Sequence, residues 1–152
     1  FFENLLWQAS SIRDRDCFSS CLPGQVAGPH LATDDIAGVA AAWLQRDDWT
    51  DTQAVSLLGP NDLTFDEIAR LLSAHLGRTI RHECLAPEAY RTELLGAGCS
   101  ASAAQGLIDM YAHLENGYAD DPFADRLLTP TSLEDWLRRQ PALAPLTAGA
   151  TP

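Results

Sequence analysis

Residues 53–85, QAVSLLGPNDLTFDEIARLLSAHLGRTIRHECL, constrain the fold more than any other stretch. A short apolar run at residues 54–58 ends in the cluster Gly-Pro-Asn-Asp, as a strand does before a turn. Thr64 and Glu67 have the spacing of a capping box, which predicts that a helix begins at Thr64. Gly77 ends this helix, since glycine adopts the left-handed cap conformation at little cost. Between the two ends, apolar side chains recur at helical spacing, at Phe65, Ile68, Ala69, Leu72 and Leu76.

The segment after this helix, residues 79–85, alternates as a strand does. One of its faces carries Ile80, His82 and Cys84. Strand, helix and strand follow one another with short connections. This order predicts a β-α-β unit whose helix packs its apolar side on a sheet.

Two earlier segments extend the pattern, FFENLL at residues 1–6 and HLATDDIAGVAAAWL at residues 30–44. Together with LLGPNDLTFDEIARLLSAHLGRTIRHECL they resemble the C-terminal, substrate-side half of an NmrA-like protein, over most of residues 1–138. That family is an atypical branch of the short-chain dehydrogenase/reductase superfamily, which binds NAD(P) on a Rossmann fold. The resemblance implies an α/β protein, a helix-rich partial Rossmann-like fold with a few short, mostly parallel strands.

The remaining elements follow from periodicity and turn signals. Helices are predicted over residues 1–14, 33–46, 87–95 and 100–115, and from a second capping box at Thr131 and Glu134 through Leu137. Residues 16–29 read as a loop with one weak strand, and residues 30–32 as a short strand. The helix from residue 33 should bury one side, made of Ile36, Val39, Ala40, Trp43 and Leu44. We expect one domain over residues 1–140 and a disordered tail over residues 141–152, which show no periodicity.

Composition limits the class of function. Of the 152 residues, 21 are acidic and ten are basic; all ten are arginine, and the net charge is −11. An acidic chain without a basic stripe is a poor nucleic-acid binder, and no apolar run approaches the ~20 residues of a membrane span. The four cysteines form no regular disulfide framework, so we expect a cytoplasmic protein. Cys17 and Cys21 lack two further ligands at metal-binding spacing, so we expect no metal site.

Two features that short-chain dehydrogenases use for their cofactor are missing. No Gly-rich strand-to-helix turn occurs near the N-terminus, and the triplet Gly96-Ala97-Gly98 follows a helix rather than a strand. The resemblance also implies a Tyr-x-x-x-Lys pair, which a chain without lysine cannot form. We therefore expect no cofactor site from this chain alone. The family implies NAD(P) only if a Rossmann half is present.

Few side chains are candidates for acid/base chemistry. The resemblance places His30 near the cofactor and substrate cleft of the family. Asp109 and His113 lie four residues apart on a predicted helix, where contact would raise the basicity of the imidazole. These three are the catalytic candidates. His82 is an alternative base, with packing inside the core as its simpler role.

Three functions remain open. The one we favour is a small-molecule binding protein, a reductase half that holds an apolar or aromatic ligand without a nucleotide loop. The second is a redox-neutral acid/base enzyme, such as a cyclase or isomerase. The third is a fragment of an NAD(P)H-dependent oxidoreductase that is active only with its missing Rossmann half. The expected pocket lies between the helices over residues 87–95 and 100–115, with ligand-binding candidates at Trp7, His82, Tyr90, Met110 and Tyr111.

The partial fold also predicts association. Strands at Leu31 and Val55 would present open edges, and the helices would cover their apolar face only in part. Exposed strand edges and apolar patches favour pairing with another chain. We expect a homodimer, or a partner chain that completes the sheet.

Overall fold

A computed structural model describes residues 1–48, 50–114 and 126–144. The elements are α1 (Asn4–Trp7), α2 (Ala9–Arg15), β1 (Cys17–Ser20), β2 (Ala27–Gly28), α3 (Thr33–Leu44), β3 (Ser56–Leu58), β4 (Leu63–Thr64), α4 (Phe65–Leu76), β5 (Arg81–Cys84), α5 (Pro87–Gly96), α6 (Ala101–Leu114), β6 (Arg126–Leu128), α7 (Leu133–Leu137) and a short 3₁₀ helix, η1 (Pro141–Leu143). Within these residues, no helix has the length and apolar character that a bilayer crossing requires. The chain is thus a helix-rich α/β protein with short, mostly parallel strands, as predicted.

Helix α4 begins and ends where its sequence predicts. The Thr64 hydroxyl accepts a hydrogen bond from the Glu67 amide (3.1 Å), and the Glu67 carboxylate accepts one from the Thr64 amide (2.9 Å). Gly77 adopts the left-handed conformation, with φ 67°. The side of α4 that faces the core buries Phe65, Ile68, Ala69, Leu71 and Leu72. The prediction of this helix from its capping box is confirmed.

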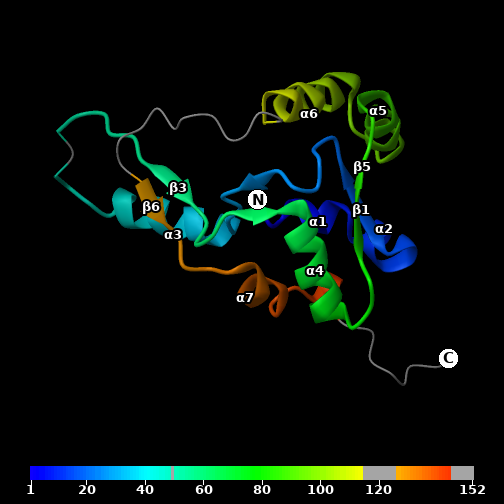
Figure 1. The fold of residues 1–152 in the computed structure, drawn as a ribbon. Helices are drawn as coiled ribbons and strands as arrows, with labels where there is room; N and C mark the ends of the chain where they lie inside the picture. The colour runs from blue at the N-terminus through cyan, green and yellow to red at the C-terminus, as the bar shows by residue number, and fades with distance from the viewer. Residues whose placement is uncertain (49, 115–125, 145–152) are drawn as a thin grey trace.

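The strands form three separate pairs. β1 pairs with β5 and β3 with β6 in parallel, whereas β2 pairs with β4 in the antiparallel sense. β3 and β5 flank α4 in sequence but pair with different strands, and Figure 1 shows the β3–β6 pair and the β1–β5 pair on different sides of the molecule. The predicted β-α-β unit is therefore right in its order and wrong in its pairing. An additional short strand, β4, lies between β3 and α4 in sequence and pairs with β2.

Most of the core surrounds α4. Trp136 of α7 is 2% exposed, and its ring lies 5.8 Å from that of Phe2. On the side of β1, the Phe18 ring lies 6.3 Å from that of Phe65. The buried cluster includes Phe2, Leu5, Ile12, Phe18, Leu22, Phe65, Ile68, Leu72, Ile80, Leu133, Trp136, Leu137 and Leu143. The N-terminal segment and α7 thus pack on α4 although they are distant in sequence.

Two carboxylates attach the first turn of α3 to this core. The Glu3 carboxylate accepts from the Thr33 amide (3.1 Å) and from Nε1 of Trp136 (2.9 Å). The Asp35 carboxylate accepts from the amide (3.0 Å) and the hydroxyl (2.8 Å) of Thr131. Because hydrogen bonds to charged groups are stronger than neutral ones, these contacts position a helix that has no fully buried side chain.

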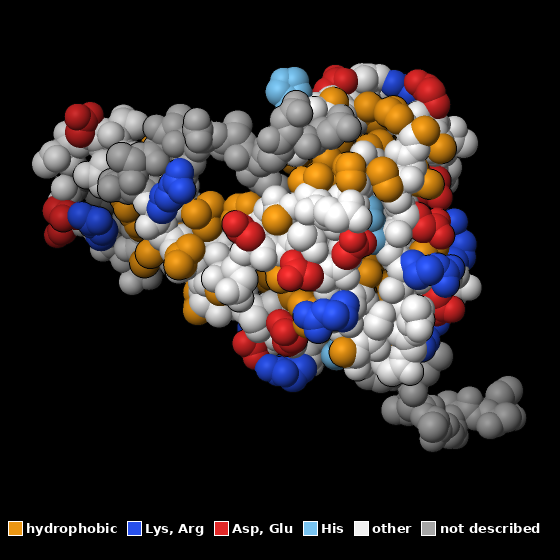
Figure 2. Space-filling view, in the orientation of Figure 1, with side chains coloured by type: hydrophobic (Ala, Val, Ile, Leu, Met, Phe, Trp, Pro, Cys, Tyr) orange, Lys and Arg blue, Asp and Glu red, His pale blue; other side chains and the backbone are white. Residues whose placement is uncertain are grey.

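The apolar side of α3 is less covered than its pattern predicts. None of its residues is fully buried, and Leu44 is 77% exposed. Leu128 of β6 is 65% exposed, and Figure 2 shows hydrophobic side chains gathered on this side of the molecule. The predicted burial of this stripe is wrong because no element of the described part of the chain packs over it completely.

The N-terminal region differs from its prediction in two ways. The helix expected over residues 1–14 breaks at Gln8 (φ −105°, ψ 11°) into α1 and α2. The strand expected over residues 30–32 is an extended segment without a ladder, and the short strand β2 precedes it. A single backbone hydrogen bond from the Phe2 amide to the Leu31 carbonyl (3.0 Å) ties this segment to the N-terminus.

The second predicted capping box is displaced by one residue. The N-cap of α7 is Ser132, whose hydroxyl accepts from the Asp135 amide at 3.1 Å. Thr131 is instead bonded to Asp35, as described above. The predicted pairing of Thr131 with Glu134 is therefore wrong. Thr131 bonds to Asp35, which is distant in sequence, and Ser132 caps the helix in its place.

The C-terminal segment is ordered further than predicted. Residues 141–143 form η1, and Leu143 is 2% exposed. The Leu143 carbonyl also lies 3.1 Å from Nε2 of His75. The tail expected over residues 141–152 thus begins with a packed turn, and residues 145–152 lie outside the described residues.

Gly59 lies where two backbone segments approach closely. A Cβ at this position would overlap the carbonyl oxygen of His30, and the Gly59 amide bonds to the Pro29 carbonyl (3.4 Å). We expect Gly59→Ala to lower the free energy of unfolding by about 2 kcal/mol or more, since the overlap is with backbone. The matched control is Gly38→Ala in α3, where a Cβ meets nothing within 4 Å. We expect Gly38→Ala to stabilise the helix by about 0.5–1 kcal/mol, as measured by urea unfolding. Equal effects at the two positions would contradict the close approach of the Gly59 and His30 backbones.

Candidate functional site

An apolar cavity among the described residues has a volume of about 240 Å³. Its walls come from the N-terminal segment, β1, the segment before α3, the first turns of α4 and the second half of α6. The lining residues are Phe1, Phe2, Asn4, Leu5, Gln8, Phe18, Ser19, His30, Phe65, Ile68, Met110, Tyr111 and Leu114. Concave, mostly apolar surfaces with a few polar groups are the usual form of a small-molecule site.

Phe65 is central to the wall on the side of α4. It is the first residue of α4, so the capping box at Thr64 fixes its backbone direction. Its ring lies 5.6 Å from the His30 ring in an edge-on arrangement and 6.3 Å from that of Phe18. All three rings line the cavity. This wall therefore presents aromatic surface rather than flexible aliphatic chains.

His30 is the titratable side chain of the lining with the largest shift. Burial lowers the pKa of its imidazole from the ordinary value of 6.5 to about 4. The ring is therefore neutral near pH 7 and is a weak base. It can accept or donate a hydrogen bond within the cavity, but it supplies no positive charge there.

This shift predicts the pH dependence of stability. Between pH 6.5 and about 4, the unfolded chain binds a proton at residue 30 that the folded chain does not, so stability falls as pH falls. The contribution of His30 approaches about 3 kcal/mol at the acid end of this window. Burial also lowers the pKa of His82, which acts in the same direction.

Urea unfolding at pH 7 and pH 5 measures the effect. We expect His30→Gln to lose less stability than the parent chain between these two pH values, because both share every other titrating group. His113→Gln removes a histidine at an exposed position and is the matched control. A loss of stability between the two pH values that is the same in His30→Gln and in the parent chain would contradict the burial of this imidazole.

A hydrogen-bonded group of polar side chains forms one edge of the cavity. The Gln8 side chain bonds to the backbone of Ser19 through both of its polar atoms, at 3.0 Å and 2.7 Å. The Ser19 hydroxyl donates to the Glu93 carboxylate at 2.7 Å, and Arg15 reaches the same carboxylate at 3.5 Å. These groups satisfy one another and hold α1, β1 and α5 together, so they shape the edge of the cavity.

Two of the predicted ligand-binding residues, Met110 and Tyr111, line the cavity from α6. Tyr90 does not; it is 6% exposed, and its ring packs edge-on against that of Tyr111 at 5.7 Å. Burial raises the pKa of both phenols, which keeps them protonated at neutral pH. Tyr90 thus supports a wall that Tyr111 forms. No residue of α5 lines the cavity, so the prediction of a pocket between the helices over residues 87–95 and 100–115 is wrong.

The other two predicted ligand-binding residues lie elsewhere. The His82 ring stacks on Phe65 with centroids 4.7 Å apart, and its Nε2 lies 2.8 Å from the buried Ser20 hydroxyl. His82 therefore packs against Phe65 and does not line the cavity. Trp7 is 78% exposed and is not among the lining residues, because it lies two residues after the buried Leu5 on α1 and so points to the opposite side of the helix.

The predicted Asp109–His113 pair is not formed through its carboxylate. Nδ1 of His113 lies 3.1 Å from the main-chain carbonyl of Asp109, whereas the Asp109 carboxylate accepts from the Gln105 side chain at 2.6 Å. Neither residue lines the cavity. Of the three catalytic candidates, the structure places only His30 in the cavity wall.

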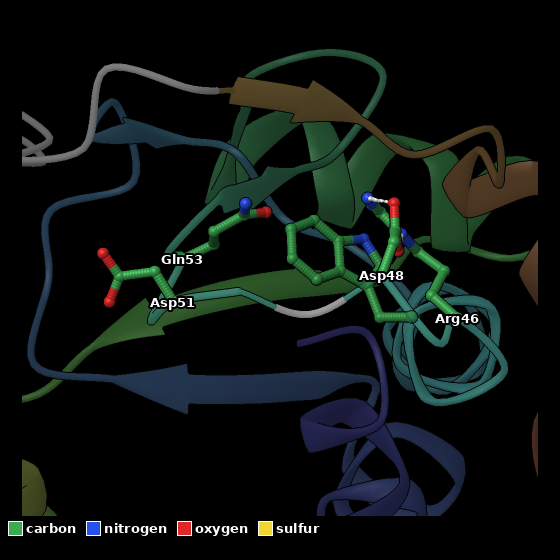
Figure 3. A pocket seen from close by; sticks show the side chains of 5 residues that line it. Arg46, Asp48, Asp51 and Gln53 are labelled. Atoms are coloured by element: carbon green, nitrogen blue, oxygen red, sulfur yellow. Dashed lines mark hydrogen bonds and ion pairs between the residues drawn. The ribbon is translucent and has the colours of Figure 1, made fainter.

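A smaller hollow lies beyond the C-terminal end of α3. It has a volume of about 10 Å³ and is lined by Trp43, Arg46, Asp48, Asp51 and Gln53. Arg46 bonds to Asp48 at 2.8 Å, as Figure 3 shows, and its guanidinium lies 5.3 Å from the centre of the Trp43 ring. This volume suits one water molecule, and exposed ion pairs contribute little. We assign no ligand to it.

The turn from β3 to α4 carries Gly59 and leads to a helix N-terminus, two features that nucleotide sites share. The Glu67 carboxylate already accepts from the Thr64 amide there, and Asp66 adds a second acidic residue to the first turn. Gly59 permits the approach to His30 rather than to a ligand. These residues do not fit a pyrophosphate, which needs free amides and no competing carboxylate.

Comparison with known proteins gives relatives among reductases. No family model matches the chain. The chain is 32% identical over 112 residues to the NAD(P)H azoreductase of Xenophilus azovorans, covering 74% of this chain and 38% of that protein. It is 37% identical over 89 residues to festuclavine dehydrogenase easG of Aspergillus fumigatus, covering 57% and 30%. The chain thus spans well under half the length of these relatives.

Solved structures give the same fold. The triphenylmethane reductase of Citrobacter sp., solved in complex with NADP(H), superposes with a TM-score of 0.72 at 19% identity, covering 91% of this chain and 49% of that one. The NADPH-dependent quinone oxidoreductase QOR2 of Escherichia coli gives 0.67 at 17% identity, covering 90% and 50%. The fold that these structures share with the chain is Rossmann-like. Within it, the chain is a relative of the NmrA-like proteins, in the atypical branch of the short-chain dehydrogenase/reductase superfamily.

Proposed function

We propose that this chain is the substrate side of an NAD(P)H-dependent reductase and that its cavity binds an apolar aromatic molecule. The single observation that carries the proposal is the cavity of about 240 Å³ with aromatic walls. The rings of Phe18, Phe65 and Tyr111 all line it. Aromatic side chains favour offset or edge-on contacts with other rings, so a planar aromatic ligand fits this lining best.

The names of the relatives support this class of substrate. They include an azoreductase, a triphenylmethane reductase and a quinone oxidoreductase. Two of the names specify NAD(P)H or NADPH, and the third protein was solved with NADP(H). For the present chain, we propose that the nucleotide is held by a further part of the enzyme, because the turn before α4 does not fit a pyrophosphate.

The same proposal gives a role to the uncovered side of α3. Leu44 and Leu128 are 77% and 65% exposed, and within the described part of the chain no further strand pairs with the β3–β6 ribbon. We propose that the nucleotide-binding part packs here and extends the sheet. Without it, two copies of the chain should associate through this surface. Sedimentation velocity at rising concentration should then show a dimer, which Leu128→Lys weakens; a monomer throughout would count against this surface.

The acid/base alternative has weaker support. It needs a base at the cavity, and His30 is the one catalytic candidate placed there. Burial lowers the pKa of His30 to about 4, which makes it a poor base at neutral pH. We therefore propose a positioning role for His30 against the aromatic ligand.

Calorimetric titration with 2-naphthol, an uncharged two-ring aromatic compound, tests the proposal. We expect saturable binding to a single site, with a heat that depends on temperature as burial of apolar surface requires. Weak, unsaturable uptake would mean that the cavity is only a defect of packing and would contradict the proposed function.

A further inference from the structure

The aromatic cavity has a deep end and an open end. Its deep end includes four buried apolar side chains, those of Phe2, Phe18, Phe65 and Ile68. Three exposed residues of the lining mark its mouth: Phe1, Asn4 and Met110. A ligand in this cavity therefore meets apolar surface at one end and solvent at the other.

Two polar side chains of the lining bond to each other's segment and to α5. Both polar atoms of the Gln8 side chain bond to the Ser19 backbone, at 3.0 Å and 2.7 Å. The Ser19 hydroxyl donates to the Glu93 carboxylate at 2.7 Å. Since these bonds use most of the hydrogen-bonding capacity of the two side chains, they leave little for a ligand.

Two polar rings of the lining are also bonded within the protein. The His30 ring is hydrogen-bonded to the backbone of Leu63. The Tyr111 hydroxyl is hydrogen-bonded to that of Tyr90. These two side chains therefore present mainly ring surface to a ligand.

Asn4 is the remaining polar side chain of the lining. It is the first residue of α1 and is exposed at the mouth. Within the described part of the chain, its carboxamide makes no hydrogen bond to another residue. A carboxamide both donates and accepts, so it can bond to a hydroxyl or a carbonyl of a ligand.

The terminal ammonium of Phe1 is a second polar group near the mouth. Burial lowers its pKa, and the nearby Glu3 carboxylate opposes this change. After burial, the charge of this ammonium is the next cause of the low pKa of His30. It is thus a competing partner for a polar group of the ligand, and the variants below separate its effect from that of Asn4.

We propose that Asn4 fixes the orientation of the ligand, an aromatic molecule with one polar end that lies beside Asn4 while its rings contact Phe18 and Phe65. The reverse orientation would place the polar group against aromatic rings. There it would lose its hydrogen bonds to water without gaining others, which is unfavourable. This inference rests on the proposed function, since it specifies the ligand class of the same site.

Calorimetric titration with 2-naphthol and with 2,6-dihydroxynaphthalene tests the orientation, because the second compound carries a hydroxyl at both ends of one ring skeleton. We expect 2,6-dihydroxynaphthalene to bind more weakly by about fivefold or more, since its second hydroxyl would enter the aromatic end without a partner. Equal or tighter binding would show a polar partner at the deep end and would overturn the proposed orientation only. Absence of saturable binding by both compounds would contradict the proposed function as well.

Asn4→Leu tests the residue itself, because it removes the carboxamide and keeps a side chain of similar size. The readout is the affinity for 2-naphthol divided by that for 2-methylnaphthalene, which has the same shape and no hydroxyl. We expect Asn4→Leu to lower this ratio by about three- to tenfold, the contribution of one hydrogen bond. Asn4→Gln, which keeps an amide, should change the ratio by less than about twofold.

Ser10→Leu is the matched control for the added apolar side chain. Ser10 is exposed and lies outside the lining, so this variant should leave the ratio unchanged. A ratio that is also unchanged in Asn4→Leu would mean that another group, such as the Phe1 ammonium, binds the hydroxyl, and it would overturn the proposal.

Discussion

Replacing Trp136 with alanine should lower the free energy of unfolding by about 3–5 kcal/mol, the largest loss we expect from one substitution. Its side chain is 2% exposed and packs on Phe2 with ring centroids 5.8 Å apart. Its Nε1 also donates to the Glu3 carboxylate, which in turn holds the start of α3. The substitution therefore leaves a cavity in the core and removes one hydrogen-bond donor from the Glu3 carboxylate. Urea unfolding followed by circular dichroism measures the loss.

Trp7→Ala is the matched control, because it removes the same side chain from an exposed position. Trp7 is 78% exposed, so its truncation should change stability by no more than about 0.5 kcal/mol. It should also leave binding of 2-naphthol unchanged, since Trp7 is not among the lining residues. Equal losses from the two variants would contradict the packing of α7 on the N-terminal segment.

Met110→Trp should reduce the affinity for 2-naphthol by about thirtyfold or more, or roughly 2 kcal/mol. Met110 lines the cavity from α6 and is 43% exposed, so a larger side chain can enter the cavity without breaking a packed core. The fused rings of the introduced tryptophan would occupy the space of the ligand. Stability should change by less than about 1 kcal/mol, which separates loss of the site from loss of the fold.

Leu95→Trp controls for the introduced side chain. Leu95 lies on α5, is 44% exposed and does not line the cavity. We expect this variant to bind 2-naphthol as the parent chain does. If Met110→Trp binds equally well, the aromatic ligand site is not this cavity.

The start and the end of α4 were predictable from the sequence because they depend on neighbouring residues. The pairing of the strands was not predictable. The capping box at Thr64 and the left-handed Gly77 are set by residues within one or two turns of each other. The pairing of β1 with β5 joins residues more than sixty positions apart. β1 is also buried along its whole length, so its four residues show no alternation by which a strand could be recognised. Propensity alone cannot supply such long-range contacts.

The candidate site was predictable only in part, because its walls also come from segments that are distant in sequence. Met110 and Tyr111 stand out on an apolar helix, and His30 was indicated by the family resemblance. Phe65 was read as core, and the sequence gives no sign that its ring also faces a cavity. Trp7 failed as a candidate because it lies two positions from the buried Leu5 on α1, which places its side chain on the opposite, exposed side of that helix.

The central claim is that this chain holds an aromatic ligand and does not hold the nucleotide. Titration of the isolated chain with NADPH, followed by the fluorescence of the nicotinamide ring, tests it most directly, with 2-naphthol bound or absent. We expect no saturable binding of NADPH under conditions in which 2-naphthol binds. Saturable, stoichiometric binding of NADPH by the isolated chain would place the nucleotide on this chain and contradict the account.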